Sequence, residues 1–300
     1  MSRQEKGPSM LYLLLSILSS TAIILIFRLF PRYSVHTFQA IVFNYLTCFV
    51  CGWLALGTFP VTRTTLQVDW LPYSLLLGAV FIFTFNITAR TVQHFGVTIT
   101  SVMQRMSLLI VVPFAIITYQ EPLPWLKAAG LLLALPAIVC TNLPDKTPSA
   151  LPVQRRGWLW FLPLFLWLNS GVVEVLLLYV ERQTAGNASL LFTTFIFGTA
   201  GLIGLLYVLP QILGGRMRVE WRNVLGGIFL GVPNFGSIFF ILKALNAGWD
   251  GSVVFPVNSV TVIGLSALSA WLLFAEKLSK INILGVALAI IAIVLIALAR

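Results

Sequence analysis

The sequence predicts an all-α integral membrane protein, in which ten transmembrane helices form two inverted five-helix repeats around a central cavity. Three observations lead to this prediction. The 300 residues are 59% hydrophobic and only 9% charged, which is too little charge for the water-facing surface of a soluble domain. The apolar residues fall into ten separate segments of membrane-crossing length. One long stretch of the chain also occurs twice.

The ten predicted spans follow one another along the chain. Each holds about 20 mostly apolar residues, the length that an α-helix needs to cross a bilayer. The first span follows Arg3 and Lys6 as in a signal peptide, but no small-x-small cleavage site comes after it, so we expect it to be retained. The spans cover approximately residues 10–29, 36–57, 70–92, 96–119, 124–143, 157–180, 187–210, 221–245, 250–274 and 280–299.

Residues 96–142 have a second copy 155 positions later. Both copies consist of a long apolar segment, a short turn with an acidic residue, and a second apolar segment. Internal repeats of this kind are typical of transporters built from two related halves. The repeat relates Gly96 to Gly251, Val102 to Val257, Ala115 to Ala270, Glu121 to Glu276, Leu123 to Leu278 and Gly130 to Gly285.

Residues 144–156 are the most polar and proline-rich stretch and form the predicted linker between the halves. We therefore predict a first five-helix repeat at residues 1–143 and a second at residues 157–300. Because five is an odd number, the second repeat enters the membrane from the opposite side. This inversion places a pseudo-two-fold axis in the membrane plane and a cavity near the bilayer midplane.

The net charge of +10 does not indicate a nucleic-acid partner. A protein that binds a polyanion gathers its lysines and arginines on one face, whereas here they lie in short loops between apolar segments. We expect the basic residues to contact the headgroups of membrane lipids and to set the orientation. Their distribution favours a cytoplasmic linker and external termini, although the positive start before the first span favours the reverse.

Cys48 and Cys51 form a CxxC pair inside an apolar segment. A redox or metal pair would need such a spacing, but no further cysteine or histidine lies nearby. We expect both thiols to pack as small apolar groups. The sequence therefore predicts neither a metal site nor a cofactor.

Two charged residues lie deep inside predicted spans, where charge is costly unless it faces a cavity or a partner. Arg105 follows Ser101 by one helical turn, and it could hold the carboxylate or phosphate of a substrate. It could equally pair with an acid on another helix. Glu174 is the only acid deep in a span, and it is open to two interpretations: a proton-binding carboxylate, or a salt bridge to Arg105 or Lys243.

Uncharged polar residues complete the expected substrate-binding set. Pro233 and Pro256 each free a backbone carbonyl inside a span, and each stands close to an asparagine. Lys243 lies near the end of its span, where it could reach the interface or the cavity. The full predicted set is Arg105, Glu174, Asn258, Asn234, Asn44, Ser101 and Lys243.

Glu121 and Glu276 precede the last helix of each half. We predict that both are interfacial and structural, because a negative charge just before a helix start is favourable against the helix dipole. Lys127 is counted with the residues near the membrane surface.

The turn around Glu121 and its counterpart around Glu276, each followed by a helix with an early glycine at Gly130 or Gly285, resemble the EamA domains of the drug/metabolite transporter superfamily. The resemblance covers nearly the whole chain. It implies a basket of ten helices with a central cavity that moves small metabolites such as amino acids, in a bacterial cytoplasmic (inner) membrane. It also implies cytoplasmic termini, against the charge count, and it identifies no binding residue.

The leading hypothesis is a secondary transporter that moves a small polar metabolite by alternating access, with a proton as a coupling ion to be tested. No GxxxxGK[ST] loop occurs, so ATP drive is not expected. A flippase or transporter of a lipid-linked or nucleotide-linked sugar is an alternative, for which Arg216, Arg218 and Arg222 could supply a basic mouth. A non-transporting scaffold is another. An enzyme is not expected, because a clustered catalytic set is missing from the sequence. A homodimer stays open.

Overall fold

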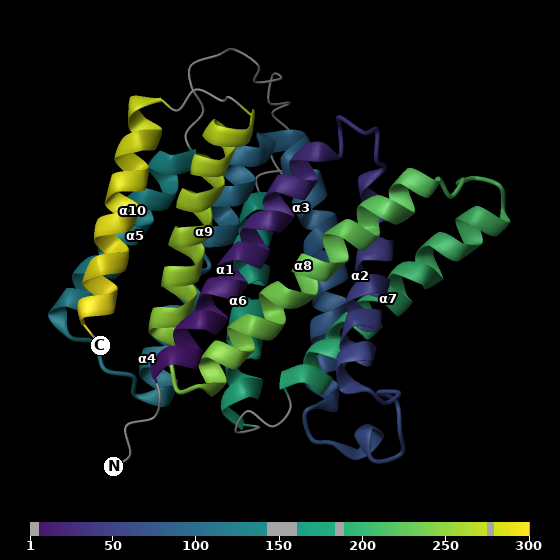
Figure 1. The fold of residues 1–300 in the computed structure, drawn as a ribbon, viewed down its shortest axis with the longest axis horizontal. Coiled ribbons are helices and arrows are strands. Elements are labelled where there is room, and N and C mark those ends of the chain that lie inside the picture. The colour runs from purple at the N-terminus through teal and green to yellow at the C-terminus, as the bar shows by residue number, and fades with distance from the viewer. Residues whose placement is uncertain (1–5, 143–160, 184–188, 275–278, 300) are drawn as a thin grey trace. The chain divides into compact units, whose positions relative to one another are not determined.

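The computed structural model describes residues 6–142, 161–183, 189–274 and 279–299, and all regular structure among them is helical (Figure 1). The predicted linker and Glu276 lie outside these residues. The helices are α1 (Lys6–Leu29), α2 (Thr37–Leu56), the short 3-10 helix η1 (Thr65–Gln67), α3 (Leu71–Arg105), α4 (Leu108–Tyr119), α5 (Trp125–Asn142), α6 (Phe161–Gln183), α7 (Ser189–Leu213), α8 (Trp221–Asn246), α9 (Gly251–Phe274) and α10 (Lys280–Leu298).

Six segments of the described chain are long and apolar enough to cross a membrane. They lie at residues 10–27, 37–56, 102–119, 161–183, 190–213 and 221–246. Four shorter apolar helices cover residues 71–84, 125–141, 251–266 and 280–296. The chain is therefore an all-helical, multi-pass membrane protein, which confirms the predicted class.

The third and fourth predicted spans, residues 70–92 and 96–119, correspond to separate apolar segments at 71–84 and 102–119, but no break in the helical backbone separates them. Helical backbone continues through residues 93–95, and the interruption comes instead at Met106 and Ser107, between α3 and α4. Gln104 nevertheless donates from Nε2 to Thr88 Oγ1 at 3.3 Å. A straight helix would separate these two residues by about 24 Å, so α3 bends sharply between them, in a segment that contains Gly96.

The described helices form two compact units. Unit 1 comprises residues 1–82 and 179–247, and unit 2 comprises residues 83–178 and 248–300. Each unit thus takes segments from both predicted repeats. The units do not coincide with the repeats, because compactness follows packing whereas the repeats follow related sequence.

In unit 1, α2 packs against both α7 and α8, and α1 packs against α8. The contact between α2 and α8 is close because two glycines of α8 face α2. A methyl group at Gly231 would lie 2.8 Å from the Asn44 carbonyl oxygen, and one at Gly227 would lie 2.6 Å from that of Ala40. Small residues at such crossings are the usual means of close helix packing in membranes.

In unit 2, α5 packs along α10, and both contact α9 (Figure 1, α5 in teal and α10 in yellow). The contact between α5 and α10 is reciprocal. A methyl group at Gly130 would lie 2.7 Å from Ile296 Cγ1, and one at Gly285 would collide with Thr141. Gly285 is the repeat counterpart of Gly130, and Ile296 stands at the same spacing from Thr141. Such a pairing, in which each element presents the same patch to the other, is what a two-fold axis produces.

Candidate functional site

The interruption between α3 and α4 lies inside an apolar segment of spanning length, residues 102–119. Arg105 ends α3, and Ser107 directly precedes α4. The turn is tightened, because Leu109 N–H donates to the Met106 carbonyl at 3.0 Å and Ile110 N–H donates to the Ser107 carbonyl at 2.8 Å. Broken helices at membrane depth are tolerated where protein or a water-filled cavity covers them.

One face of α6 covers this interruption. Trp167 Nε1 donates to the Met106 carbonyl at 2.8 Å, which satisfies an oxygen at the break. Gly171, one turn further on, lets Ile110 approach so closely that a methyl group there would lie 2.9 Å from Ile110 Cβ. Glu174 follows after about one more turn, on the same face. These contacts therefore fix the position of α6 along its own axis relative to the interruption.

Glu174 faces the two ends of the interruption. The Ser107 hydroxyl and the Arg105 guanidinium are the polar groups that act on its carboxyl group. Glu174 Oε2 and Ser107 Oγ are both buried without a hydrogen-bond partner among the described residues. We call Arg105, Ser107 and Glu174 the junction site.

Further polar contacts between α3 and α6 flank the junction site. Asn169 of α6 donates from Nδ2 to Thr84 Oγ1. Thr88, one turn after Thr84 on α3, accepts the hydrogen bond from Gln104, the neighbour of Arg105. These contacts give the neutral groups around the junction hydrogen-bond partners. The groups left without a partner among the described residues are Glu174 Oε2 and the Ser107 hydroxyl. A small polar molecule placed there would meet a cation, a hydroxyl donor and an acidic acceptor.

In unit 1, the structure brings together two other predicted site residues. Asn234 Nδ2 donates to Asn44 Oδ1 at 3.1 Å, across the close contact between α8 and α2. Ser237 Oγ donates to the Asn234 carbonyl at 2.8 Å, and Ser16 Oγ donates to the Ser237 carbonyl at 2.8 Å. These neutral groups join α1, α2 and α8, and Asn44 Nδ2 is left as a buried donor without a partner.

The remaining predicted residues have separate surroundings. Asn258 is buried on α9 of unit 2. Lys243 of unit 1 places Nζ 5.7 Å from the ring centre of Phe239, as in a cation–π contact. The Ser101 side chain lies outside the described residues. The predicted set is thus distributed over two units, and the structure brings Arg105 to Glu174 and Asn44 to Asn234.

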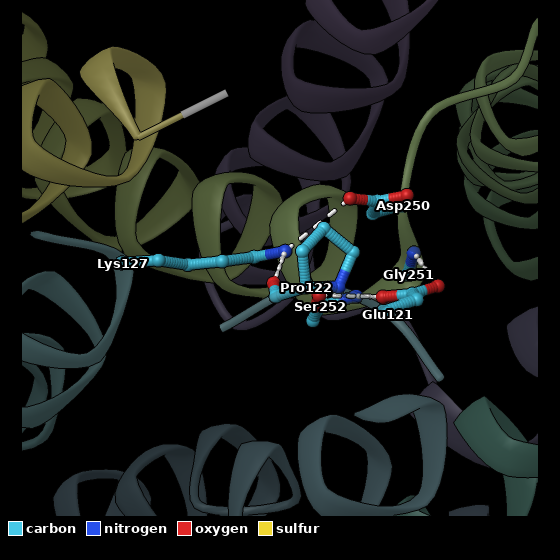
Figure 2. Close-up of polar contacts among 6 residues, drawn as sticks. All are labelled: Glu121, Pro122, Lys127, Asp250, Gly251 and Ser252. Atoms are coloured by element: carbon cyan, nitrogen blue, oxygen red, sulfur yellow. Dashed lines mark hydrogen bonds and ion pairs between the residues drawn. The ribbon is translucent and has the colours of Figure 1, made fainter. Parts of the chain in front are cut away.

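Glu121 has a role that the sequence prediction missed. It was expected at the interface, acting on the next helix, but only 6% of it is exposed and its carboxylate caps α9 instead (Figure 2). Gly251 N–H donates to Oε1 and Ser252 N–H donates to Oε2, each at 2.8 Å, and the Ser252 hydroxyl also bonds to Oε2. The negative charge lies at the positive end of the α9 dipole, where it stabilises the helix start.

Lys127 is also buried, with 2% of its side chain exposed. Its Nζ donates to the Pro122 carbonyl at 2.9 Å and pairs with Asp250 Oδ2 at 3.3 Å (Figure 2). We call Glu121, Lys127, Asp250, Gly251 and Ser252 the α9 clamp. A clue was present in the sequence, because Glu121 and Gly251 belong to the stretches that define the repeat.

No family model matches the chain. An uncharacterized protein of Haemophilus influenzae is 28% identical over 288 residues, which cover 94% of this chain and 95% of that protein. A solved crystal structure of a protein matches with a TM-score of 0.71 and 15% identity over 98% of both chains. At this identity the likeness concerns the fold alone, so the helical fold of the whole chain is one already seen in a solved structure.

Proposed function

We propose that this chain is a secondary transporter that moves a small polar metabolite, an amino acid or a related compound, by alternating access at a midplane site. The observation that carries the proposal is the junction site. Its cation and its acid lie within apolar segments of spanning length, beside an interruption in a helix, and Glu174 Oε2 has no hydrogen-bond partner among the described residues. Intramembrane charge that is left open marks a substrate or ion pathway by default, and interrupted helices commonly form such sites.

We further propose ten transmembrane spans in two inverted repeats of the EamA type, in a bacterial cytoplasmic membrane. Four shorter apolar helices accompany the six long ones, which together would give the ten spans. The reciprocal contact of Gly130 and Gly285 supports the inversion, because it relates α5 to α10 by an approximate two-fold axis. The relative from Haemophilus influenzae supports only the bacterial part of this proposal.

The chemistry of the junction site favours a substrate that carries both charges. The Arg105 guanidinium can hold a carboxylate through two parallel hydrogen bonds. Glu174 can accept hydrogen bonds from an ammonium group, or it can bind the coupling proton when substrate is absent. Ser107 can donate to either the substrate or a water molecule. An amino acid would satisfy all three groups.

A metabolite panel tests the proposal directly. Purified protein would be screened for thermal stabilisation, since a ligand at 100 times its dissociation constant adds about 2.7 kcal/mol. We expect stabilisation by one or more zwitterionic compounds, lost in Arg105→Ala and in Glu174→Gln. Arg222→Ala removes an exposed arginine that pairs with Glu220, at 2.6 Å, and it should leave the response unchanged.

Uptake into proteoliposomes completes the test. Flux of the stabilising compound, lost in Arg105→Ala and retained in Arg222→Ala, would support the transporter. Binding without flux of any compound would instead indicate a scaffold, and flux of a lipid-linked sugar alone would indicate a flippase. Unchanged binding in both junction variants would show that the site lies elsewhere.

A further inference from the structure

The ion pair of the α9 clamp joins the two predicted repeats, and it has no charged counterpart at the repeat-related positions. At the repeat spacing, Lys127 corresponds to Asn282 and Asp250 corresponds to Phe95. Neither counterpart carries a charge. The second copy of these positions therefore cannot form an ion pair, whatever conformation the protein adopts.

Asn282, at the related position, makes different contacts. Its amide Nδ2 donates to the carbonyls of Cys140 and Thr141, each at 3.1 Å, and so fastens the start of α10 to the end of α5. It also forms a capping box with Ser279. Lys127 lies at the same depth in its own helix, the third residue of α5, but it reaches Asp250 just before α9.

The clamp makes a tight connection between the α4–α5 turn and the start of α9. The Lys127 amine is almost fully buried, and its bond to the Pro122 carbonyl fixes the turn from which Glu121 also extends. Glu121 in turn holds the first two amides of α9. Removing one partner of a buried pair leaves the other charge uncompensated, so the connection is stable as long as both charges are present.

An interaction that has no repeat-related counterpart has a specific consequence in an inverted-repeat transporter. Such a transporter alternates by moving one repeat or bundle against the other around a fixed site, so the two end states exchange the environments of the related halves. A contact between the halves whose repeat-related counterpart can also form has an equivalent in either state. A contact whose counterpart cannot form stabilises one state over the other.

We propose that the Lys127–Asp250 pair is a one-sided lock, which favours the state in which the α4–α5 turn is held to the start of α9 over the oppositely facing state. This inference rests on the proposed transport function. The lock sets the resting population of the two states, and a substrate must overcome this bias in each cycle.

The test measures how accessible the junction site is from each side of the membrane. Ser107→Cys would be placed in a full-length chain whose Cys48, Cys51 and Cys140 are replaced by alanine, and the protein would be reconstituted in one orientation. A membrane-impermeant maleimide is added outside or trapped inside, and the ratio of the two labelling rates reports the two populations. We expect Asp250→Asn to change this ratio by about fivefold or more.

Two further variants separate the lock from a general loss of structure. The reversed pair, Lys127→Asp with Asp250→Lys, should return the ratio toward that of the parent protein. Glu220→Gln breaks the exposed pair with Arg222, whose side chains are 48% and 53% exposed, and it should leave the ratio unchanged. A ratio that Asp250→Asn leaves unchanged would refute the lock while the transporter stands. Labelling of the parent protein from one side only would refute alternating access itself.

Discussion

Two carboxyl groups of unit 2 are held in opposite ways. Glu121 has both oxygens bonded, to two backbone amides and one hydroxyl at the start of α9. Within the described part of the chain, the buried oxygen Oε2 of Glu174 accepts no hydrogen bond, although Arg105 and Ser107 act on the group. A carboxylate whose two oxygens both accept hydrogen bonds from another helix holds the two segments together. An open one keeps its bonding capacity for something that is not part of the protein, so the difference separates a structural acid from a candidate binding acid.

Replacing each of the two glutamates by glutamine tests this comparison, and the larger loss of stability is expected for Glu121→Gln. In Glu121→Gln the new NH₂ group faces an N–H donor, so one buried amide of α9 loses its acceptor and the helix start loses a negative charge. We expect the free energy of unfolding to fall by about 3 kcal/mol, from the unsatisfied donor and the lost helix-dipole interaction together. Denaturant titration in detergent micelles would measure it. A loss below about 0.5 kcal/mol, typical of surface substitutions, would show that the α9 clamp does not stabilise the fold.

A smaller effect is expected at Gly171, which sets the distance between α6 and the junction. A methyl group at this position would crowd Ile110. We therefore expect Gly171→Ala to destabilise the protein by about 1–3 kcal/mol through overpacking and to weaken ligand binding by displacing Glu174. The matched control is Gly264→Ala on α9, where a methyl group has no neighbour within 4 Å. Equal unfolding midpoints for the two variants would contradict the close contact.

The sequence was sufficient to predict those features that depend on local composition. Apolar segments of spanning length gave the all-helical membrane class, and the cost of intramembrane charge selected Arg105 and Glu174, which the structure brings to one junction. The role of the two residues stays a prediction. The interruption at Met106 and Ser107 was not predicted, because both residues are compatible with a continuous helix and the break is held by Trp167 on a different helix.

The contacts of the α9 clamp could not be predicted from the sequence. Glu121 and Gly251 are 130 residues apart, and nothing in the local sequence of either predicts the other as a partner. A glutamate before a helix predicts capping of that next helix, which here is α5. Tertiary packing of the α4–α5 turn against α9 decides instead which helix start receives the charge, and it also buries Lys127.

The smallest expected change in stability completes the comparison. Glu174→Gln keeps the shape of the side chain, and it removes no hydrogen bond from Glu174 Oε2, which accepts none among the described residues. A neutral amide also costs less to bury than a carboxylate, and this offsets the negative charge that the buried Arg105 loses from its surroundings. We therefore expect the free energy of unfolding to change by less than about 1 kcal/mol, while ligand stabilisation is lost. If Glu174→Gln instead destabilised the protein as much as Glu121→Gln, the carboxyl group of Glu174 would also have a structural role. The open oxygen would then give no reason to place a substrate beside Arg105.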